Sequence, residues 1–178
     1  SGPTALSDPV GVEVQRVRSA AQMLVAATAV FDRVDAAVLA AAVSDYTVRS
    51  PSTEKIKRES ETLSLDLVRN PDIAAVLGEH KKEKVLVGFA AETESGFDRA
   101  REKLRRKKLD LIVLNNVLEE GAGFASDTNR VTLIDAADEV VSLPRMAKLA
   151  VADRLLDRVR DLCRSRGRKP DKAAPLKS

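Results

Sequence analysis

Two apolar runs of the sequence end at residues that could bind a ligand. Asp45 follows the small apolar run 36–43, and Phe89 lies near the end of the run 84–91. If these runs are strands of an open parallel sheet, their carboxyl ends form the edge at which such sheets bind ligands. A carboxylate there can accept a hydrogen bond from a ribose hydroxyl or hold a magnesium ion, and an aromatic ring can pack on a base or sugar. The alternatives are a turn aspartate and ordinary packing at a strand end.

A further candidate is the sequence Asn70, Pro71, Asp72 and Ile73, which is typical of a helix start. Asn70 suits the N-cap position and Pro71 suits the first helical position. The free backbone N–H groups of a helix start, together with the helix dipole, favour an anion such as a phosphate. Most helix starts bind no ligand, so this pattern needs support from other residues.

Lysines at suitable spacing could give that support. Segment 99–108 holds seven Lys and Arg residues and one acid. Lys103 and Lys107 are one helical turn apart, so their ammonium groups project from one face and could bind adjacent phosphates of a triphosphate. Lys55 lies in the polar stretch 47–62, where a lysine on a lid could stabilise charge on a reacting phosphate or acyl phosphate. A solvated helix face and an ordinary surface lysine are the alternatives.

Composition and charge exclude several classes of protein. The 178 residues include one cysteine, Cys163, and one histidine, His80, which excludes disulfide scaffolds, zinc modules and serine-protease-type triads. No apolar run approaches the roughly 18 residues needed to span a bilayer, so a cytoplasmic protein without a membrane partner is expected. Residues 164–178 carry six of the 30 basic and one of the 27 acidic residues, which leaves 24 against 26 for residues 1–163, a net charge of −2. A basic segment on a slightly acidic body favours a discrete anion over nucleic acid.

Apolar runs and amphipathic stretches alternate along the chain and predict an α/β fold. The runs 36–43, 84–91 and 109–116 lack polar alternation, as expected for parallel strands that helices cover on both faces. The fold expected is a Rossmann-like three-layer parallel sheet over residues 1–163, with a protruding flap at 47–62 and a basic, disordered tail at 164–178. Further strands are expected at 12–17 and 63–68, and extra C-terminal edge strands at 130–134 and 139–143. Helices are expected to start at Ser19, Asn70, Ser95 and Ser142 with Pro144.

Seven short blocks of the sequence are distinctive in their order. They are SGPTAL (1–6), AAAVSDY (40–46), EKIKR (54–58), LVRNPDI (67–73), VGFAAET (87–93), AREKLRRKKLDLIV (100–113) with NNV after it, and GFASDTN (123–129). Taken together, these blocks resemble the phosphopantothenate–cysteine ligase family of coenzyme A biosynthesis. In bacteria that domain is usually the C-terminal half of a bifunctional protein whose N-terminal half is a flavin-dependent decarboxylase.

The resemblance implies a ligase that uses CTP and Mg²⁺ to activate the carboxylate of 4′-phosphopantothenate as an acyl-cytidylate. Cysteine then attacks, which gives 4′-phosphopantothenoylcysteine, CMP and, from the first step, pyrophosphate. By the same resemblance, Lys55 would be the catalytic lid lysine, and it would serve the neighbouring subunit because the family works as a homodimer. The implied nucleotide-binding positions are Asp45, Lys55, Asn70, Pro71, Asp72, Ile73, Phe89, Lys103 and Lys107.

The resemblance also indicates parts of the family that this chain lacks. Family members carry a strand, a Gly-rich turn and an Asn/Ser-containing segment before the block at 1–6, so the domain is expected to miss its first strand–helix unit. The decarboxylase half is absent too, so no flavin is expected in this chain. Two rival functions stay open: a catalytically silent nucleotide-binding or dimerisation module, and a nucleic-acid binder that uses segment 99–108 and the tail.

Overall fold

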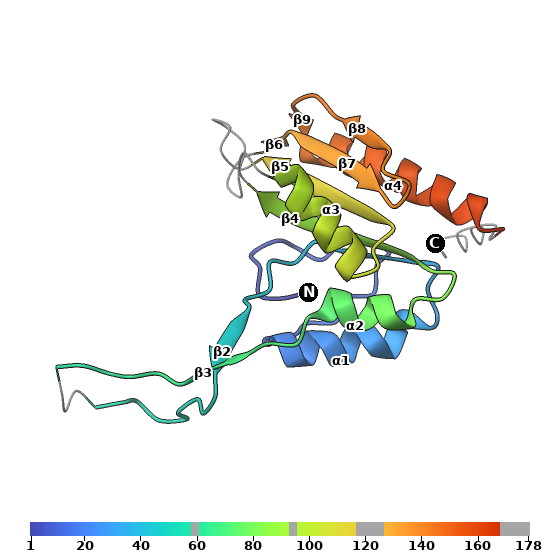
Figure 1. The fold of residues 1–178 in the computed structure, drawn as a ribbon. Coiled ribbons are helices and arrows are strands. Elements are labelled where there is room, and N and C mark those ends of the chain that lie inside the picture. Colours follow the sequence, from blue (N-terminus) through green and yellow to red (C-terminus); the bar gives the residue numbers. More distant parts are fainter. Residues whose placement is uncertain (58–60, 93–95, 117–126, 168–178) are drawn as a thin grey trace.

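The centre of the computed structural model is a five-stranded mixed sheet (Figure 1). The structure describes residues 1–57, 61–92, 96–116 and 127–167. The sheet has the order β1-β4-β5-β7-β8, with β1, β4 and β5 parallel and β7 and β8 antiparallel. Its strands are β1 (Ala36–Leu39), β4 (Val85–Glu92), β5 (Leu111–Asn116), β7 (Val131–Asp135) and β8 (Val140–Ser142). The α/β fold is confirmed, and so are the extra C-terminal edge strands, since β7 and β8 pair antiparallel through a short turn beside the parallel strands β1, β4 and β5.

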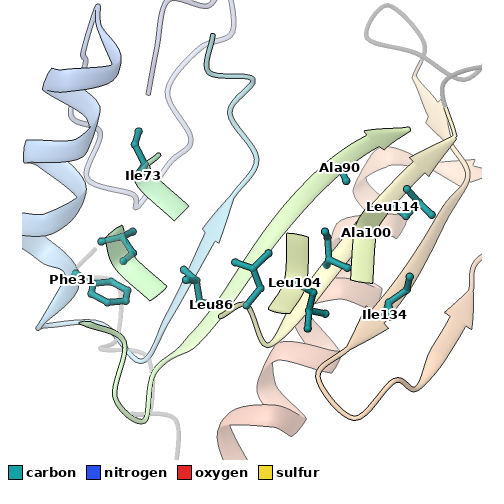
Figure 2. Packing of buried hydrophobic residues seen from close by; sticks show 11 residues of the cluster. Phe31, Ile73, Leu86, Ala90, Ala100, Leu104, Leu114 and Ile134 are labelled. Atoms are coloured by element: carbon teal, nitrogen blue, oxygen red, sulfur yellow. The ribbon is translucent and has the colours of Figure 1, made fainter. Parts of the chain in front are cut away.

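Helices cover both faces of this sheet. The helices α1 (Ala20–Phe31), α2 (Ile73–His80) and α3 (Gly96–Arg106) pack on one face, and α4 (Lys148–Ser165) packs on the other. Because successive strand residues point to opposite faces, Leu86 of β4 joins the first apolar cluster and Val87 joins the second. Figure 2 shows the first cluster, in which Phe31 from α1 and Leu104 from α3 face the same layer of the sheet as Leu86. The predicted arrangement of helices on both faces is therefore confirmed.

Three strand boundaries differ from the sequence-based expectation. The run 36–43 forms a strand only as far as Leu39, and residues 40–43 are exposed, because β1 is the edge strand of the sheet and has β4 on one side only. Residues 12–17 form no strand; their backbone bonds to Ser1, whose carbonyl accepts the N–H of Val17 at 2.9 Å, and Arg16 pairs with Asp8. The strand expected at 63–68 is confined to β3 (Leu67–Arg69).

The predicted flap is confirmed. Strands β2 (Tyr46–Val48) and β3 pair antiparallel and carry an arm that protrudes from the body of the fold in Figure 1. At the base of the arm, Arg49 Nε lies 2.5 Å from Asp66 Oδ2. The backbone N–H of Arg49 also donates to the carbonyl of Asp66 at 2.9 Å.

The helix starts agree only in part with the expectation. Ser19 caps α1, because its hydroxyl accepts the N–H of Gln22 at 3.2 Å. The start expected at Ser142 and Pro144 is wrong: α4 begins at Lys148. The intervening residues form β9 (Met146–Ala147), which pairs with β6 (Thr128–Asn129). Ser95, the expected cap of α3, lies outside the described residues, and no helix in the described part of the chain is both long and apolar enough to cross a membrane.

Asp110, just before β5, is a buried carboxylate with bonds to three parts of the fold. The residue is 2% exposed, and its Oδ1 lies 2.5 Å from both Lys81 Nζ and Arg166 Nη2. Its Oδ2 accepts the N–H of Leu86 at 2.8 Å, and Arg166 Nη1 donates to the carbonyl of Lys84 at 2.9 Å. The end of α4 and the residues after it, up to Arg166, are therefore fixed to the amino end of the sheet, although they belong to the segment expected to be a tail. Residues 168–178 of that segment lie outside the described residues.

Replacing Asp110 by Ala should lower the free energy of unfolding by about 3 kcal/mol, because two partly buried cations and a buried N–H lose their acceptor. Urea unfolding followed by circular dichroism would measure the loss. Asp66→Ala is the matched control, since its ion pair with Arg49 is exposed and should contribute less than about 1 kcal/mol. Equal losses in the two variants would contradict the role given to Asp110.

Candidate functional site

A cavity of about 1180 Å³ lies at the carboxyl ends of β1 and β4, beside the start of α2 and the end of α3. Its volume is somewhat above the range of about 300–1,000 Å³ found for small-molecule sites. Eight of the nine residues predicted for the site line it, and these are Asp45, Asn70, Pro71, Asp72, Ile73, Phe89, Lys103 and Lys107. The structure therefore brings together residues that are up to 62 positions apart in the sequence, from Asp45 to Lys107.

Lys55 is the ninth predicted residue, and the structure does not place it with the others. It lies on the arm carried by β2 and β3, its side chain is exposed, and it does not line the cavity. Its predicted catalytic role therefore needs either closure of the arm or a site on another copy of the chain.

Asn70 joins the residues just before β2 to the start of α2. Its N–H donates to the carbonyl of Asp45 at 2.8 Å, and its side-chain Nδ2 donates to the carbonyl of Ser44 at 2.9 Å. The prediction that Asn70 is the N-cap and Pro71 the first helical residue is wrong: Asp72 is the N-cap and α2 begins at Ile73, while the side-chain amide of Asn70 bonds to Ser44. Asp45 is exposed at the cavity, and its backbone position is set by Asn70.

The N-cap of α2 is Asp72. Its Oδ1 accepts the N–H of Ala75 at 3.1 Å, which satisfies one of the free N–H groups of the first turn. Ile73 is 7% exposed and packs in the core cluster, so it fixes the helix to the body of the protein while it lines the cavity. The buried side chain of Ile73 therefore holds the start of α2 at the cavity wall.

Lys107 lies directly opposite this helix start. Its Nζ is 3.1 Å from the second carboxylate oxygen of Asp72, Oδ2. Lys103 is one turn earlier on α3, and its carbonyl accepts the N–H of Lys107 at 2.9 Å. Two lysines and the start of a helix therefore border the same part of the cavity, which is a suitable environment for a polyphosphate.

A glycine that the sequence analysis did not single out sets the distance between α2 and α3. A Cβ atom at Gly78 would lie 2.1 Å from the carbonyl oxygen of Lys107, so only glycine allows the two backbones to approach this closely. The neighbouring pair of Glu79 Oε2 and Lys108 Nζ, 2.5 Å apart, joins the same helices on the surface. A lone glycine inside a short helical pattern is the sequence signal that could have pointed to this contact.

Phe89 and Gly88 form the β4 side of the cavity. Phe89 is 40% exposed, so one part of its ring is open to a ligand. A Cβ at Gly88 would lie 2.7 Å from Leu109 Cδ1, which shows that this glycine makes room for a core side chain. For Gly88 the packing interpretation therefore has direct structural support.

The cavity continues beyond the predicted residues in two directions. Asn115, at the end of β5, lines it with a buried Oδ1 that has no hydrogen-bond partner in the described part of the chain. In the other direction the cavity is apolar and runs between α1, with Met23 and Val30, and the free edge of β1 at Val38. Neither extension was predicted, because both depend on how elements far apart in the sequence pack.

The carboxylates of the cavity fit one kind of metal binding. Asp45, Asp72 and Glu13 line it, and no group of three or more His, Cys, Asp or Glu residues suited to a metal occurs among the described residues. Magnesium is commonly held by one or two carboxylates together with the phosphates of a nucleotide. The residues present therefore suit a magnesium ion that arrives with a nucleotide rather than a metal held by the protein alone.

Two arginines with raised pKa values lie away from the cavity. The pKa of Arg101 is raised chiefly by its hydrogen bond to Asp138, whose Oδ1 lies 2.6 Å from Nε. Burial lowers the pKa of Arg158, but hydrogen bonds to Asp135 and Glu139 raise it by more. Both arginines stay charged and stabilise the fold around β7 and β8.

Comparison with known proteins assigns the chain to a family. Residues 1–162 match the family described as DNA/pantothenate metabolism flavoprotein C-terminal domain. The chain belongs to this family. A crystal structure of the C-terminal domain of the coenzyme A biosynthesis bifunctional protein CoaBC is similar, with a TM-score of 0.76 and 36% identity over 92% of this chain and 74% of that chain. The predicted resemblance to the C-terminal domain of that bifunctional protein is confirmed.

Two relatives by sequence give the extent of the match. The coenzyme A biosynthesis bifunctional protein CoaBC of Bacillus subtilis is 43% identical over 168 residues, which are 94% of this chain and 41% of that protein. A cysteine/cysteine sulfinic acid decarboxylase from an unknown prokaryotic organism is 43% identical over 149 residues, 83% of this chain and 42% of that protein. The chain thus spans about two fifths of the length of these two relatives.

Proposed function

We propose that the cavity binds CTP and that the chain is the ligase part of a coenzyme A biosynthesis enzyme. In this reaction 4′-phosphopantothenate and cysteine are joined to 4′-phosphopantothenoylcysteine, with CMP and pyrophosphate as the other products. The observation that carries the proposal is the convergence of eight of the nine predicted residues on one cavity. Membership of the family and the coenzyme A biosynthesis function in the names of its relatives support the same assignment.

The residues at the cavity have distinct roles in the proposed reaction. Lys103 and Lys107 bind the phosphates of CTP, which lie against the start of α2. A carboxylate oxygen of 4′-phosphopantothenate attacks the α-phosphorus, the bond to the β-phosphate breaks, and pyrophosphate leaves with the lysines balancing its charge. The amine of cysteine then attacks the acyl carbon, loses a proton to solvent, and CMP leaves.

Three further residues orient the nucleotide in this proposal. Asp45 accepts a hydrogen bond from a ribose hydroxyl or helps to hold magnesium, and the open part of the Phe89 ring packs on the base or sugar. Asn70 keeps the backbone of Asp45 in place through its N–H. Magnesium, when bound, would neutralise part of the phosphate charge.

Lys55 is proposed to act on the acyl-cytidylate in the site of a second subunit. The arm that carries Lys55 protrudes from its own body, so its lysine is free to reach another copy (Figure 1). The arm also exposes large apolar side chains that a homodimer interface would cover, and these are Tyr46, Ile56, Leu63, Leu65 and Leu67.

The complete enzyme is proposed to contain more than this chain. The free edge of β1 and the apolar cavity beside it offer a place for the first strand–helix unit of the family. A flavin-dependent decarboxylase is proposed as the fused or associated partner, since the curated relatives are longer bifunctional proteins. A cytoplasmic location is proposed for the whole enzyme.

A catalytically silent nucleotide-binding module is the second candidate, and the distance of Lys55 from the cavity favours it. It predicts CTP binding without pyrophosphate release in the presence of 4′-phosphopantothenate. The nucleic-acid interpretation has less support, because several cations around segment 99–108 are paired within the chain: Arg101 with Asp138, and Lys108 with Glu79. The nucleic-acid interpretation would be favoured if the protein bound a polynucleotide with an affinity that falls steeply with salt concentration.

Replacing Lys103 and Lys107 together by Ala should raise the Kd for CTP by a factor equivalent to about 1–3 kcal/mol, because two charge-assisted contacts to phosphate are lost. Calorimetry with CTP and magnesium in the full-length protein would measure this. Lys108→Ala is the matched control, since Lys108 follows Lys107 directly but does not line the cavity. Unchanged CTP affinity in the double variant would contradict the phosphate role.

Replacing Lys55 by Gln should slow product formation while CTP binding changes little, because Lys55 acts after the nucleotide is bound. Mixing this variant with the Lys103 and Lys107 double variant tests the second-subunit role. In mixed dimers one site combines an intact cavity with an intact arm, so about a quarter of the wild-type turnover should return. Wild-type turnover of the Lys55→Gln protein alone would refute the catalytic role, and no recovery on mixing would refute action across subunits.

A further inference from the structure

Asp72 performs two tasks with its two carboxylate oxygens. Oδ1 caps α2 through the N–H of Ala75 at 3.1 Å, and Oδ2 lies 3.1 Å from the ammonium group of Lys107. The side chain of Asp72 is 44% exposed and that of Lys107 is 23% exposed, so both remain in contact with solvent at the cavity. Without a ligand, the charge of Lys107 is therefore balanced by an internal anion.

A nucleotide cannot simply be added to this arrangement. If a phosphate approaches Lys107, it also approaches the Asp72 carboxylate, and like charges repel. An ion pair as exposed as this one contributes only about 0–1 kcal/mol, so a polyphosphate can replace Asp72 as the partner of Lys107. The carboxylate of Asp72 then lies beside the phosphates, and its charge repels theirs unless a cation lies between the carboxylate and the phosphates.

The two helices cannot relieve this conflict by moving apart. Leu77 of α2 and Leu104 of α3 are buried in the same apolar cluster, which holds the two helices together. Asp72 is also held by its cap bond to Ala75. The rearrangement is therefore confined to the end of the Lys107 side chain and to the free oxygen of Asp72.

We propose that Asp72 and Lys107 exchange partners when the nucleotide binds. Lys107 moves from the carboxylate to a phosphate, and Oδ2 of Asp72 becomes a ligand of the magnesium ion that accompanies the triphosphate. Asp72 thereby makes the site selective for the magnesium form of the nucleotide over the free form. This inference rests on the proposed function, because it needs a nucleoside triphosphate in this cavity.

Asp72→Asn tests the exchange, because Asn keeps the cap of α2 and removes the charge. Calorimetry would give the Kd of CTP with magnesium and with EDTA for the full-length protein. The wild type should bind the magnesium form more tightly. In the variant, binding of free CTP should improve about two- to five-fold, the equivalent of an exposed ion pair, and the preference for magnesium should shrink by at least that factor.

Glu79→Gln is the matched control. It removes one carboxylate from the same helix and breaks a pair between the same two helices, yet Glu79 does not line the cavity. This control should keep the wild-type preference for magnesium. Asp72→Ser, a second substitution that retains a cap, should behave like Asp72→Asn, which separates the lost charge from any effect of the amide.

Other outcomes overturn the inference or the function beneath it. If Asp72→Asn prefers the magnesium form of CTP over the free form as strongly as the wild type does, the exchange is overturned. The exchange is also overturned if Asp45→Asn loses this preference and Asp72→Asn keeps it. Wild-type protein that binds CTP neither with magnesium nor with EDTA would contradict the proposed function itself, and the exchange with it. CTP binding to the wild type with an unchanged ratio in the variant leaves the proposed function standing and rejects only the role of Asp72.

Discussion

The backbone contact between α2 and α3 at Gly78 is the constraint on which the candidate site depends. A side chain at this position would collide with the carbonyl of Lys107, at 2.1 Å from the Cβ. Because the contact is made by glycine, the start of α2 and the end of α3 lie close enough for Asp72 and Lys107 to touch. The part of the cavity suited to phosphates follows from this one approach of two helices.

The charged groups include a buried cluster and an exposed pair. At the amino end of the sheet, Asp110 is buried and its oxygens are bonded to Lys81, Arg166 and the N–H of Leu86, so this cluster stabilises the fold. In the cavity, the pair of Asp72 and Lys107 is exposed and easily broken.

The sequence predicts the elements of this fold better than their connections. The buried strands and the amphipathic helices follow from periodicity. Strand-end and helix-start rules led to six of the eight predicted residues that line the cavity, and the spacing of Lys103 and Lys107 led to the other two. Asn70 was predicted as a cap because of its type, but its amide bonds to Ser44, a contact across 26 positions that no local pattern contains. The role of Gly78 depends on how two helices cross, and the position of Lys55 depends on the direction of the arm, so neither could be read from local sequence.

Amide hydrogen exchange of the full-length protein, with and without CTP and magnesium, would test most directly whether the nucleotide binds where α2 meets α3. Bound phosphates should slow exchange at the start of α2, residues 72–77, and at the end of α3, residues 103–107, because the ligand joins these segments. Exchange in β7 and β8, on the far side of the sheet from β1, should not change. Protection confined to β7 and β8, or absent from both helix segments while CTP is bound, would contradict this location of the site.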